Sequence, residues 1–164
     1  MELYVSDSKL GGKGTFTRTP VKKGTHLKTL SGEMINLNEV WKRIESGQEN
    51  YDDPLQIGED LFIDLDEPSR QINHSCDPNC CLKGQSELFA IKDIKAGDEL
   101  TYDYSATVSK NIPAEVWSMN CICGSVNCRH VIGNVLTIPS KQLEKYRKVG
   151  ALQDYILEEL KSPI

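Results

Sequence analysis

Three cysteines in "CICGSVNC", residues 121–128, constrain this chain more than any other short stretch. Cys121, Cys123 and Cys128 have the spacing C-x-C-x4-C, and closely spaced thiolates on a loop are typical zinc ligands. Zinc takes four ligands in a tetrahedron, so a fourth must come from elsewhere in the sequence. Free thiols in a loop, or one redox pair, are the alternatives. A structural metal site is the favoured interpretation.

The fourth ligand has five candidates, which are Cys76, Cys80, Cys81, His74 and His130. Cys76 follows a predicted strand end, where a side chain is held in place, whereas the adjacent Cys80 and Cys81 point to opposite faces of a strand. Cys76, in the segment "INHSCDPNCC" (72–81), is therefore the best candidate. The same segment leaves open a thiol nucleophile with His74 as its base, although such pairs usually come from distant segments.

The size and composition of the chain indicate one globular domain. With 164 residues and 38% apolar content, it can bury about 70% of its unfolded surface. No apolar run approaches the roughly 20 residues that span a bilayer. The first residues lack an apolar signal region, so we expect no secretory signal and an intracellular protein. Six cysteines in that setting favour reduced thiols or metal over disulfides.

The charge distribution restricts the partners. A net charge of −5 and a pI of about 5.2 argue against direct nucleic-acid binding. Residues 45–67 carry nine Asp or Glu and no Lys or Arg. Such an acidic run would attract a basic peptide and form part of its groove, or else it is a solvated loop. We expect no membrane partner, and a monomer or weak homodimer.

Hydrophobic periodicity predicts many short strands and few helices. Strands are expected near Gly14–Thr17 and His26–Leu30, at 61–66, and within 86–104 on both sides of a turn at 95–98. A helix is expected over 37–46, with Asn36 or Asn38 as its cap and Gly47 as its stop.

The last thirty residues show a helical pattern from Pro139-Ser140 and again after Gly150, which we expect to pack on the domain rather than to meet a partner. Together these elements indicate a mostly-β or α+β domain. The chain has no strand–helix–strand alternation, which disfavours a doubly wound nucleotide-binding sheet. The stretch "GGKG" lacks the spacing of a dinucleotide-binding loop.

Five stretches, taken in order, resemble the SET-domain protein lysine methyltransferases. They are "GGKGTF" (11–16), "LSGEMI" (30–35), "SRQINHSCDPN" (69–79), "GDELTYDY" (97–104) and "CICGSVNCR" (121–129). The last resembles the family's post-SET segment. The resemblance implies a β-clip fold in which Asn73–Cys76 threads beneath a loop near the C-terminus. It also implies a SET core over 1–120, a post-SET zinc segment over 121–133 and a C-terminal helical extension over 134–164.

The same resemblance implies S-adenosylmethionine as methyl donor and a lysine side chain in a basic peptide as acceptor, with a histone-like tail as one candidate. The residues that match the family's donor-binding positions are Lys13, Gly14, Arg70, Asn73, His74, Tyr104 and Ile132. Tyr104 and Tyr102 match the tyrosines at the methyl-transfer centre. The residues that match the zinc ligands are Cys76, Cys121, Cys123 and Cys128. One structural zinc is expected.

Four positions depart from the family pattern. Leu30 replaces a tyrosine, which removes a hydroxyl expected on the lysine channel, and Gln71 and His130 replace an aromatic residue and a glycine. Tyr102, where other members have phenylalanine, resembles members restricted to early methylation states. The alternatives are a catalytically silent SET-like module that binds a basic peptide or partner, and a zinc-knuckle interaction domain. The expected location is nuclear for a eukaryotic source, and cytoplasmic or exported to a host for a bacterial one.

Overall fold

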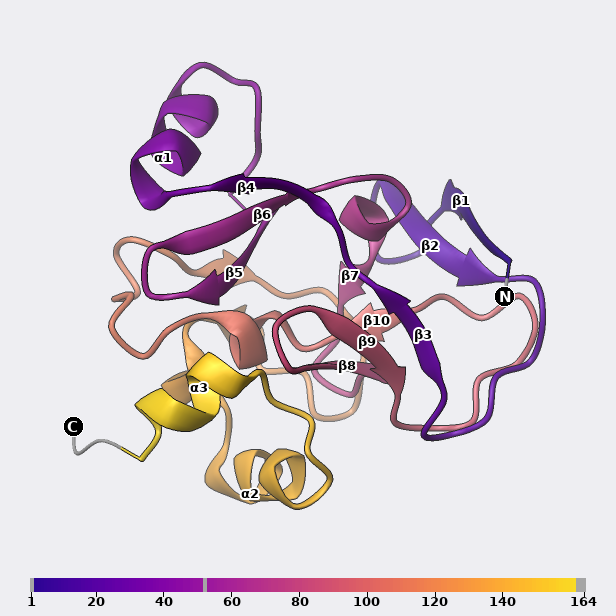
Figure 1. Cartoon of the computed structure of the whole chain (residues 1–164). Coiled ribbons are helices and arrows are strands. Elements are labelled where there is room, and N and C mark those ends of the chain that lie inside the picture. The colour runs from indigo at the N-terminus through magenta and orange to yellow at the C-terminus, as the bar shows by residue number, and fades with distance from the viewer. Residues whose placement is uncertain (1, 52, 162–164) are drawn as a thin grey trace.

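The computed structural model describes residues 2–51 and 53–161, and it consists mostly of short strands with a few helices (Figure 1). β1 (Leu3–Asp7) pairs antiparallel with β2 (Lys13–Thr17). One three-stranded sheet has the order β3 (His26–Thr29), β9 (Glu87–Ala90), β8 (Cys80–Lys83). The other has the order β4 (Gly32–Ile35), β6 (Leu61–Leu65), β5 (Pro54–Gly58). The predicted α+β class is confirmed.

Two short pairings join segments that are far apart in the sequence. β7 (Asn73–His74) pairs in parallel with β10 (Thr101–Tyr102), and β11 (Met119–Asn120) pairs antiparallel with β12 (Val131–Ile132). The side chain of Asn79 extends the first pairing, because its amide donates to the Glu99 carbonyl (2.7 Å) and its oxygen accepts from the Thr101 N–H (2.9 Å). The "INHSC" segment is therefore fixed against residues 99–102.

Helix α1 (Leu37–Glu45) lies at one end of the molecule, beyond β4 (Figure 1). The side chain of Asn36 accepts a hydrogen bond from the Glu39 N–H (2.9 Å), and that of Asp60 accepts from the Leu37 N–H (2.8 Å). These contacts satisfy two of the free N–H groups at the start of the helix. Asn36 is therefore the cap, and Asn38 lies inside the helix.

The C-terminal helices α2 (Ser140–Lys148) and α3 (Asp154–Glu159) pack on the rest of the chain. Their core includes Tyr146, Leu152 and Ile156, all buried together with Cys81 of β8. Gln153, whose side chain is fully buried, donates to the carbonyls of Gln56 and Gln85. The tail thus contributes a second hydrophobic cluster, as the helical pattern predicted.

The prediction for residues 86–104 is confirmed except at its end. β9 and β10 lie on the two sides of the turn at 95–98, where the Asp98 N–H donates to the Lys95 carbonyl (3.1 Å), and each pairs with other strands. Tyr104 does not continue the strand; it begins a 3₁₀ turn, η2 (Tyr104–Thr107), because the Asp103 side chain accepts from the Ser105 N–H (3.1 Å).

Among the described helices, none combines the length and apolarity that crossing a membrane requires.

Candidate functional site

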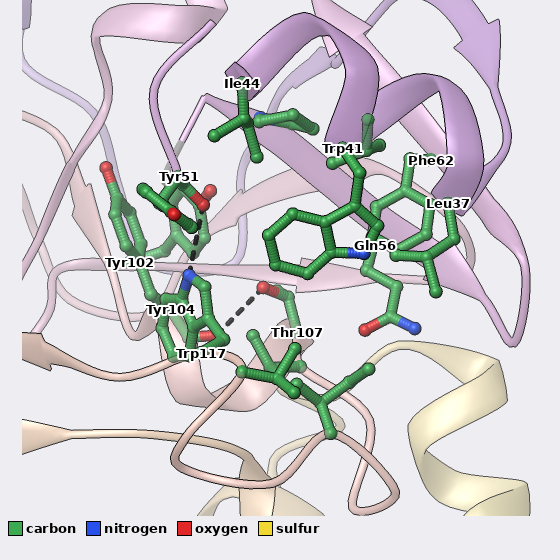
Figure 2. A pocket seen from close by; sticks show the side chains of 15 residues that line it. Leu37, Trp41, Ile44, Tyr51, Gln56, Phe62, Tyr102, Tyr104, Thr107 and Trp117 are labelled. Carbon is green, nitrogen blue, oxygen red and sulfur yellow. Dashed lines mark hydrogen bonds between the residues drawn. The ribbon is translucent and has the colours of Figure 1, made fainter.

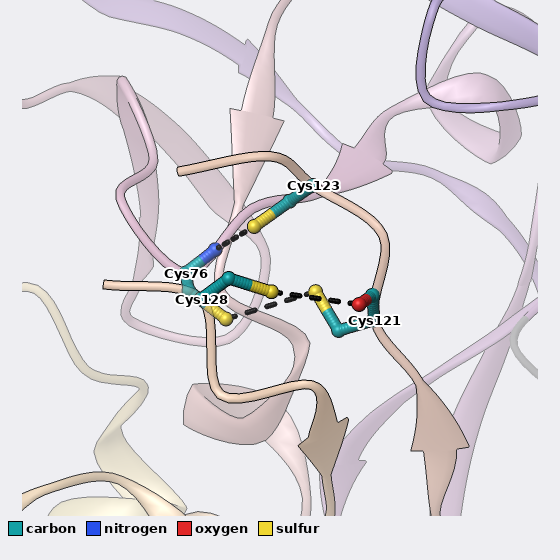
Figure 3. Close-up of side chains that lie close together, drawn as sticks. All are labelled: Cys76, Cys121, Cys123 and Cys128. Carbon is teal, nitrogen blue, oxygen red and sulfur yellow. Dashed lines mark hydrogen bonds between the residues drawn. The ribbon is translucent and has the colours of Figure 1, made fainter. Parts of the chain in front are cut away.

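The four predicted metal ligands lie together (Figure 3). The sulfur atoms of Cys76, Cys121, Cys123 and Cys128 are all within 4.8 Å of one another, and Cys76 Sγ is 3.7 Å from Cys121 Sγ. Tetrahedral zinc with Zn–S bonds of about 2.3 Å holds its sulfurs about 3.8 Å apart. The cluster therefore has the donor set and the spacing that zinc requires.

Hydrogen bonds to sulfur support the same conclusion. The Cys76 N–H donates to Cys123 Sγ (3.5 Å), and the backbone N–H and the Nε of Arg129 donate to Cys76 Sγ (3.4 and 3.3 Å). Although burial opposes it, hydrogen bonding with Ser125 and with the Cys76 backbone lowers the pKa of the Cys123 thiol to about 6. Thiolate is the form that binds a metal.

The other candidates for the fourth ligand do not belong to this group of sulfur atoms. Cys80 and Cys81 are both buried on opposite faces of β8, the first in the main core and the second in the C-terminal cluster. His130 is exposed and has a positive φ of 63°. His74 uses its Nδ1 to accept from the Tyr104 N–H (3.1 Å). Only Cys76 joins the three cysteines among the described residues.

His74 and Cys76 do touch, at 3.3 Å between Nε2 and Sγ, but they do not form an activated thiolate pair. Burial, followed by the positive charge of Arg129, lowers the pKa of His74 to about 3. Burial also raises the pKa of the Cys76 thiol. A neutral imidazole beside a neutral thiol is a poor nucleophilic pair. The position of Cys76 Sγ among three other sulfur atoms is what favours its metal-ligand role.

A first depression, here called the polar hollow, lies next to the cysteine cluster. Its lining consists of Leu10, Asn73, His74, Tyr104, Met119, Asn120, Cys121, Ile122 and Cys123. The Asn73 amide donates to the Lys13 carbonyl (2.8 Å) and to Glu99 Oε1 (2.7 Å). Gly14 allows this approach, since a Cβ there would lie 2.2 Å from Glu99 Oε1. The polar hollow therefore depends on contacts between β2, β7 and the 119–123 segment.

Of the seven predicted donor-binding residues, three line the polar hollow: Asn73, His74 and Tyr104. Lys13 and Gly14 reach it only through the Lys13 carbonyl that holds Asn73. The Arg70 guanidinium instead contacts Asp64 and Glu49 and donates to the Leu65 carbonyl (2.8 Å). Ile132 is fully buried on β12, opposite Met119.

Four residues that line the polar hollow were not predicted from the motifs: Leu10, Met119, Asn120 and Ile122. Leu10 immediately precedes "GGKG", and Met119 and Asn120 immediately precede the first cysteine of the trio. Proximity to these motifs was the one available signal, because none of the four has a distinctive side-chain chemistry for a polar ligand.

A second depression, here called the aromatic hollow, has a volume of about 640 Å³ and opens to solvent. Figure 2 shows Trp41, Tyr51, Tyr102, Tyr104 and Trp117 around it. The rings of Tyr102 and Tyr104 lie 4.8 Å apart between centroids. The two predicted tyrosines therefore share one cavity wall, even though Tyr104 has left the strand.

Tyr104 lines both hollows. Its hydroxyl donates to the Ile72 carbonyl (2.8 Å), and its ring meets that of His74 edge-on, with 5.4 Å between centroids. A ligand in the polar hollow and a side chain in the aromatic hollow would therefore meet at this one tyrosine.

A buried polar network supports the turn that carries Tyr104. Asp103 accepts from Arg129 Nη2 (2.5 Å) and from the Tyr146 hydroxyl (3.1 Å). Burial raises the pKa of the Asp103 carboxyl, while Arg129 opposes that rise. This network connects the cysteine cluster, the tyrosine turn and α2, and the motifs gave no indication of its role.

The 45–67 segment and Leu30 differ in their relation to the aromatic hollow. The 45–67 segment contributes Tyr51, Pro54, Gln56 and Phe62, but none of its described acidic side chains lines the hollow. Asp64 and Glu49 instead pair with arginines inside the fold. Leu30 is 1% exposed and belongs to the main core, and it is not among the described residues that line either hollow.

Comparison with known proteins identifies the class. The SET domain family model matches residues 12–105, more than half of the chain, and the chain belongs to this family. The match ends before the cysteine trio, so the post-SET assignment of 121–133 stays a prediction.

The chain is 35% identical to the Drosophila melanogaster histone-lysine N-methyltransferase ash1 over 134 residues, covering 74% of this chain and 6% of that protein. It is 37% identical over 97 residues to the Neurospora crassa H3 lysine-9 specific methyltransferase dim-5, covering 47% and 29%. It thus spans a small part of these relatives.

Solved structures give the same fold. The Chaetomium thermophilum Polycomb Repressive Complex 2, in an autoinhibited conformation bound to S-adenosylmethionine, superposes with a TM-score of 0.59 at 26% identity. That alignment covers 64% of this chain and 15% of the other. An apo form of the complex gives a TM-score of 0.60.

Proposed function

We propose that this protein is an S-adenosylmethionine-dependent protein-lysine N-methyltransferase. The relatives named as histone-lysine methyltransferases support the reaction class, and the donor bound to the Polycomb complex supports the choice of donor. The observation that carries the proposal is the position of Tyr104 between the two hollows. The donor would bind the polar hollow, and the substrate lysine would enter through the aromatic one.

The polar hollow suits the donor in its chemistry. Asn73 and His74 line it with polar side chains, and Met119 and Ile122 offer apolar surface for a nucleobase. S-adenosylmethionine, when bound, supplies a methyl group on a sulfonium that an amine can displace directly. No metal or nucleophilic side chain of the protein is needed for that displacement.

The aromatic hollow prepares the lysine. A lysine with an ordinary pKa of about 10.4 must lose a proton to attack, which costs about 4 kcal/mol near pH 7.4. Apolar walls such as Phe62, Trp41 and Trp117 disfavour the charged form and lower that cost. The Tyr104 hydroxyl donates a hydrogen bond to the Ile72 carbonyl, which fixes the position of its oxygen; a hydroxyl oxygen can accept weak C–H contacts from a methyl group. The residues thereby align the amine with the donor.

The cysteine cluster would hold one structural zinc. Cys121 and Cys123 belong both to the cluster and to the lining of the polar hollow, so the metal would fix one wall of the donor site. A closed set of four thiolates leaves no open position for substrate, which fits a structural role. The cluster thus supports the reaction without taking part in it.

Transfer of labelled methyl groups tests the proposal. Wild type, Tyr104→Phe and the control Tyr4→Phe, which lies on β1 outside both hollows, are incubated with labelled S-adenosylmethionine and a mixture of basic proteins. Wild type and Tyr4→Phe should label lysines, and Tyr104→Phe should be about 100-fold slower, as for loss of one transition-state contact. Donor binding by wild type without any label transfer would contradict the proposal and favour the silent SET-like module.

A further inference from the structure

The aromatic hollow extends well beyond the two tyrosines at its inner end. Helix α1 contributes Leu37, Val40, Trp41 and Ile44, and the stretch after η2 contributes Ile112, Val116 and Trp117. The outer part of the hollow therefore lies between α1 and residues 112–117, as Figure 2 shows for Trp41 and Trp117.

The side chains of this outer part are held in place by contacts with Tyr51. Trp41 meets the Tyr51 ring edge-on, with 6.0 Å between centroids. Trp117 Nε1 donates to the Tyr51 carbonyl (3.1 Å). Tyr51 itself is 59% exposed and Val116 is 37% exposed. The hollow is thus an ordered apolar surface that water reaches, which is the kind of surface that marks a binding site.

The described part of the lining carries no charge. None of the 15 described residues that line the hollow is Asp, Glu, Lys, Arg or His. Its amide side chain, Gln56, is already paired, since its nitrogen donates to the Gly58 carbonyl (3.0 Å) and its oxygen accepts from the Ser109 N–H (3.0 Å). A charged side chain in the hollow would lose water without gaining a partner, whereas an apolar side chain would gain from burial.

We propose that the aromatic hollow selects lysines that have a bulky apolar residue beside them in the substrate sequence. This inference rests on the proposed function, because it takes the lysine to enter next to Tyr102 and Tyr104. Those tyrosines and the outer part belong to one continuous hollow. An extended peptide advances about 3.3 Å per residue and alternate side chains share a face, so the residue two positions from the lysine would point toward Trp41, Tyr51 and Trp117. The substrate class is thus a lysine flanked by Leu, Ile, Met or Phe.

Tryptophan fluorescence tests the inference without turnover. The chain has two tryptophans, Trp41 and Trp117, and both line the aromatic hollow. Peptides that differ only at the position two residues from the lysine (Leu, Gly or Arg) are titrated in the absence of methyl donor. The Leu peptide should bind about 10- to 100-fold more tightly than the Gly peptide, the factor expected for burial of one leucine side chain. Tightest binding of the Arg peptide would overturn the inference.

Variants locate the preference. In Tyr51→Ala, and separately in Trp41→Ala, the Leu-to-Gly ratio of affinities should fall to about one. Tyr51 is exposed, so its replacement leaves the fold intact even if Trp41→Ala does not. The matched control is Met34→Ala, because Met34 is 53% exposed on β4 and lies outside the hollow. A full ratio in both hollow variants would overturn the inference.

Two further measurements separate the alternatives. Sedimentation that shows a dimer of the free protein, dissociated by Trp41→Ala, would overturn the inference by assigning the hollow to a second copy of the chain. In the labelling assay, the Leu peptide should give a 10- to 100-fold higher kcat/KM than the Gly peptide. Equal rates for all peptides would overturn the inference while the proposed function stands. Leu-selective binding without any label transfer would support the selection and contradict the methyltransferase function.

Discussion

On one side of Tyr104, hydrogen bonds between distant segments fix the walls; on the other side, packing of aromatic and aliphatic side chains fixes them. The polar hollow depends on Asn73 reaching Lys13 and Glu99, and on His74 accepting from Tyr104. The aromatic hollow depends on Trp41 against Tyr51. Hydrogen bonds demand particular side chains at fixed geometry, whereas apolar packing accepts many side chains of similar volume.

The difference fits the separate tasks that the proposed function gives to the two sides. A ligand shared by a whole family needs a fixed arrangement of donors and acceptors, and the polar hollow offers one within motifs of that family. A protein substrate varies among family members, and the aromatic hollow is built largely from residues outside those motifs. Changes in the two hollows should therefore affect donor and peptide separately, which the following predictions test.

The largest effect is expected from Cys76→Ser and Cys123→Ser. Each removes one of the four thiolate ligands and should therefore abolish zinc binding. The loss of stability should be large, because structural zinc in small sites contributes on the order of 10 kcal/mol to folding of its segment. Loss of the 121–128 wall should also abolish donor binding, since Cys121 and Cys123 line the polar hollow. Metal analysis and thermal denaturation measure both effects.

The control for the cysteine variants is Cys81→Ser, which changes a buried thiol of the C-terminal cluster outside the metal group. It should lower the melting temperature and leave about one zinc per chain. A full zinc content in both Cys76→Ser and Cys123→Ser would show that the four cysteines are not the ligands.

A smaller effect, confined to the polar side, is expected from Asn73→Ala. The change removes the side-chain amide that donates hydrogen bonds to the Lys13 carbonyl and to Glu99, and leaving such groups unpaired costs about 1–3 kcal/mol. Donor affinity, measured by calorimetry, should fall about 10- to 100-fold, while the affinity of a peptide that binds the aromatic hollow should stay within twofold. An equal fall in both affinities would mean that the two hollows are not independent.

The two sides also differ in how far the sequence predicted them. Asn73, His74 and Cys76 were predicted because they stand together in one short motif that resembles the family's, although their partners lie far away in the sequence. The spacing of the trio predicted a metal group before any geometry was known. Arg70 matched a motif too, yet the carboxylates of Asp64 and Glu49 hold it inside the fold.

The aromatic hollow was not predicted, since it gathers residues from α1, from the 51–62 stretch and from 112–117. No periodicity within one segment shows that Trp41 and Trp117 lie across the same cavity. For a related reason, the count of acidic residues over 45–67 did not show that Asp64 faces Arg43 and Arg70, because a count of charges does not show which side chains the fold brings together. Tyr104 left its strand because Asp103 caps the following turn.

The stability of the protein is expected to depend on pH through Glu49, which lies two residues before Tyr51 of the aromatic hollow. Burial, and then the neighbouring Asp64, raise the pKa of Glu49 from 4.5 to about 7. Between these values the folded protein holds a proton that the unfolded chain releases, so the free energy of unfolding falls as the pH rises from about 4.5 to 7. Denaturant unfolding of wild type and Glu49→Gln at a series of pH values measures this. The slope should be smaller in Glu49→Gln, and an unchanged slope would assign it to other groups.

The smallest effect is expected from Asn36→Ala at the start of α1. Loss of the hydrogen bond to the Glu39 N–H should lower the free energy of unfolding by about 1 kcal/mol. Because α1 carries Trp41 and Ile44, peptide affinity should fall a few-fold, whereas donor affinity should not change. Asn38→Ala is the matched control: the same substitution two residues later falls inside the helix, on an exposed side chain, where alanine is the better helix former. If both variants lose the same stability, the Asn36 cap does not position the aromatic hollow. If only Asn36→Ala loses stability, and only its peptide affinity falls, then the aromatic hollow depends on the start of α1 and the polar hollow does not.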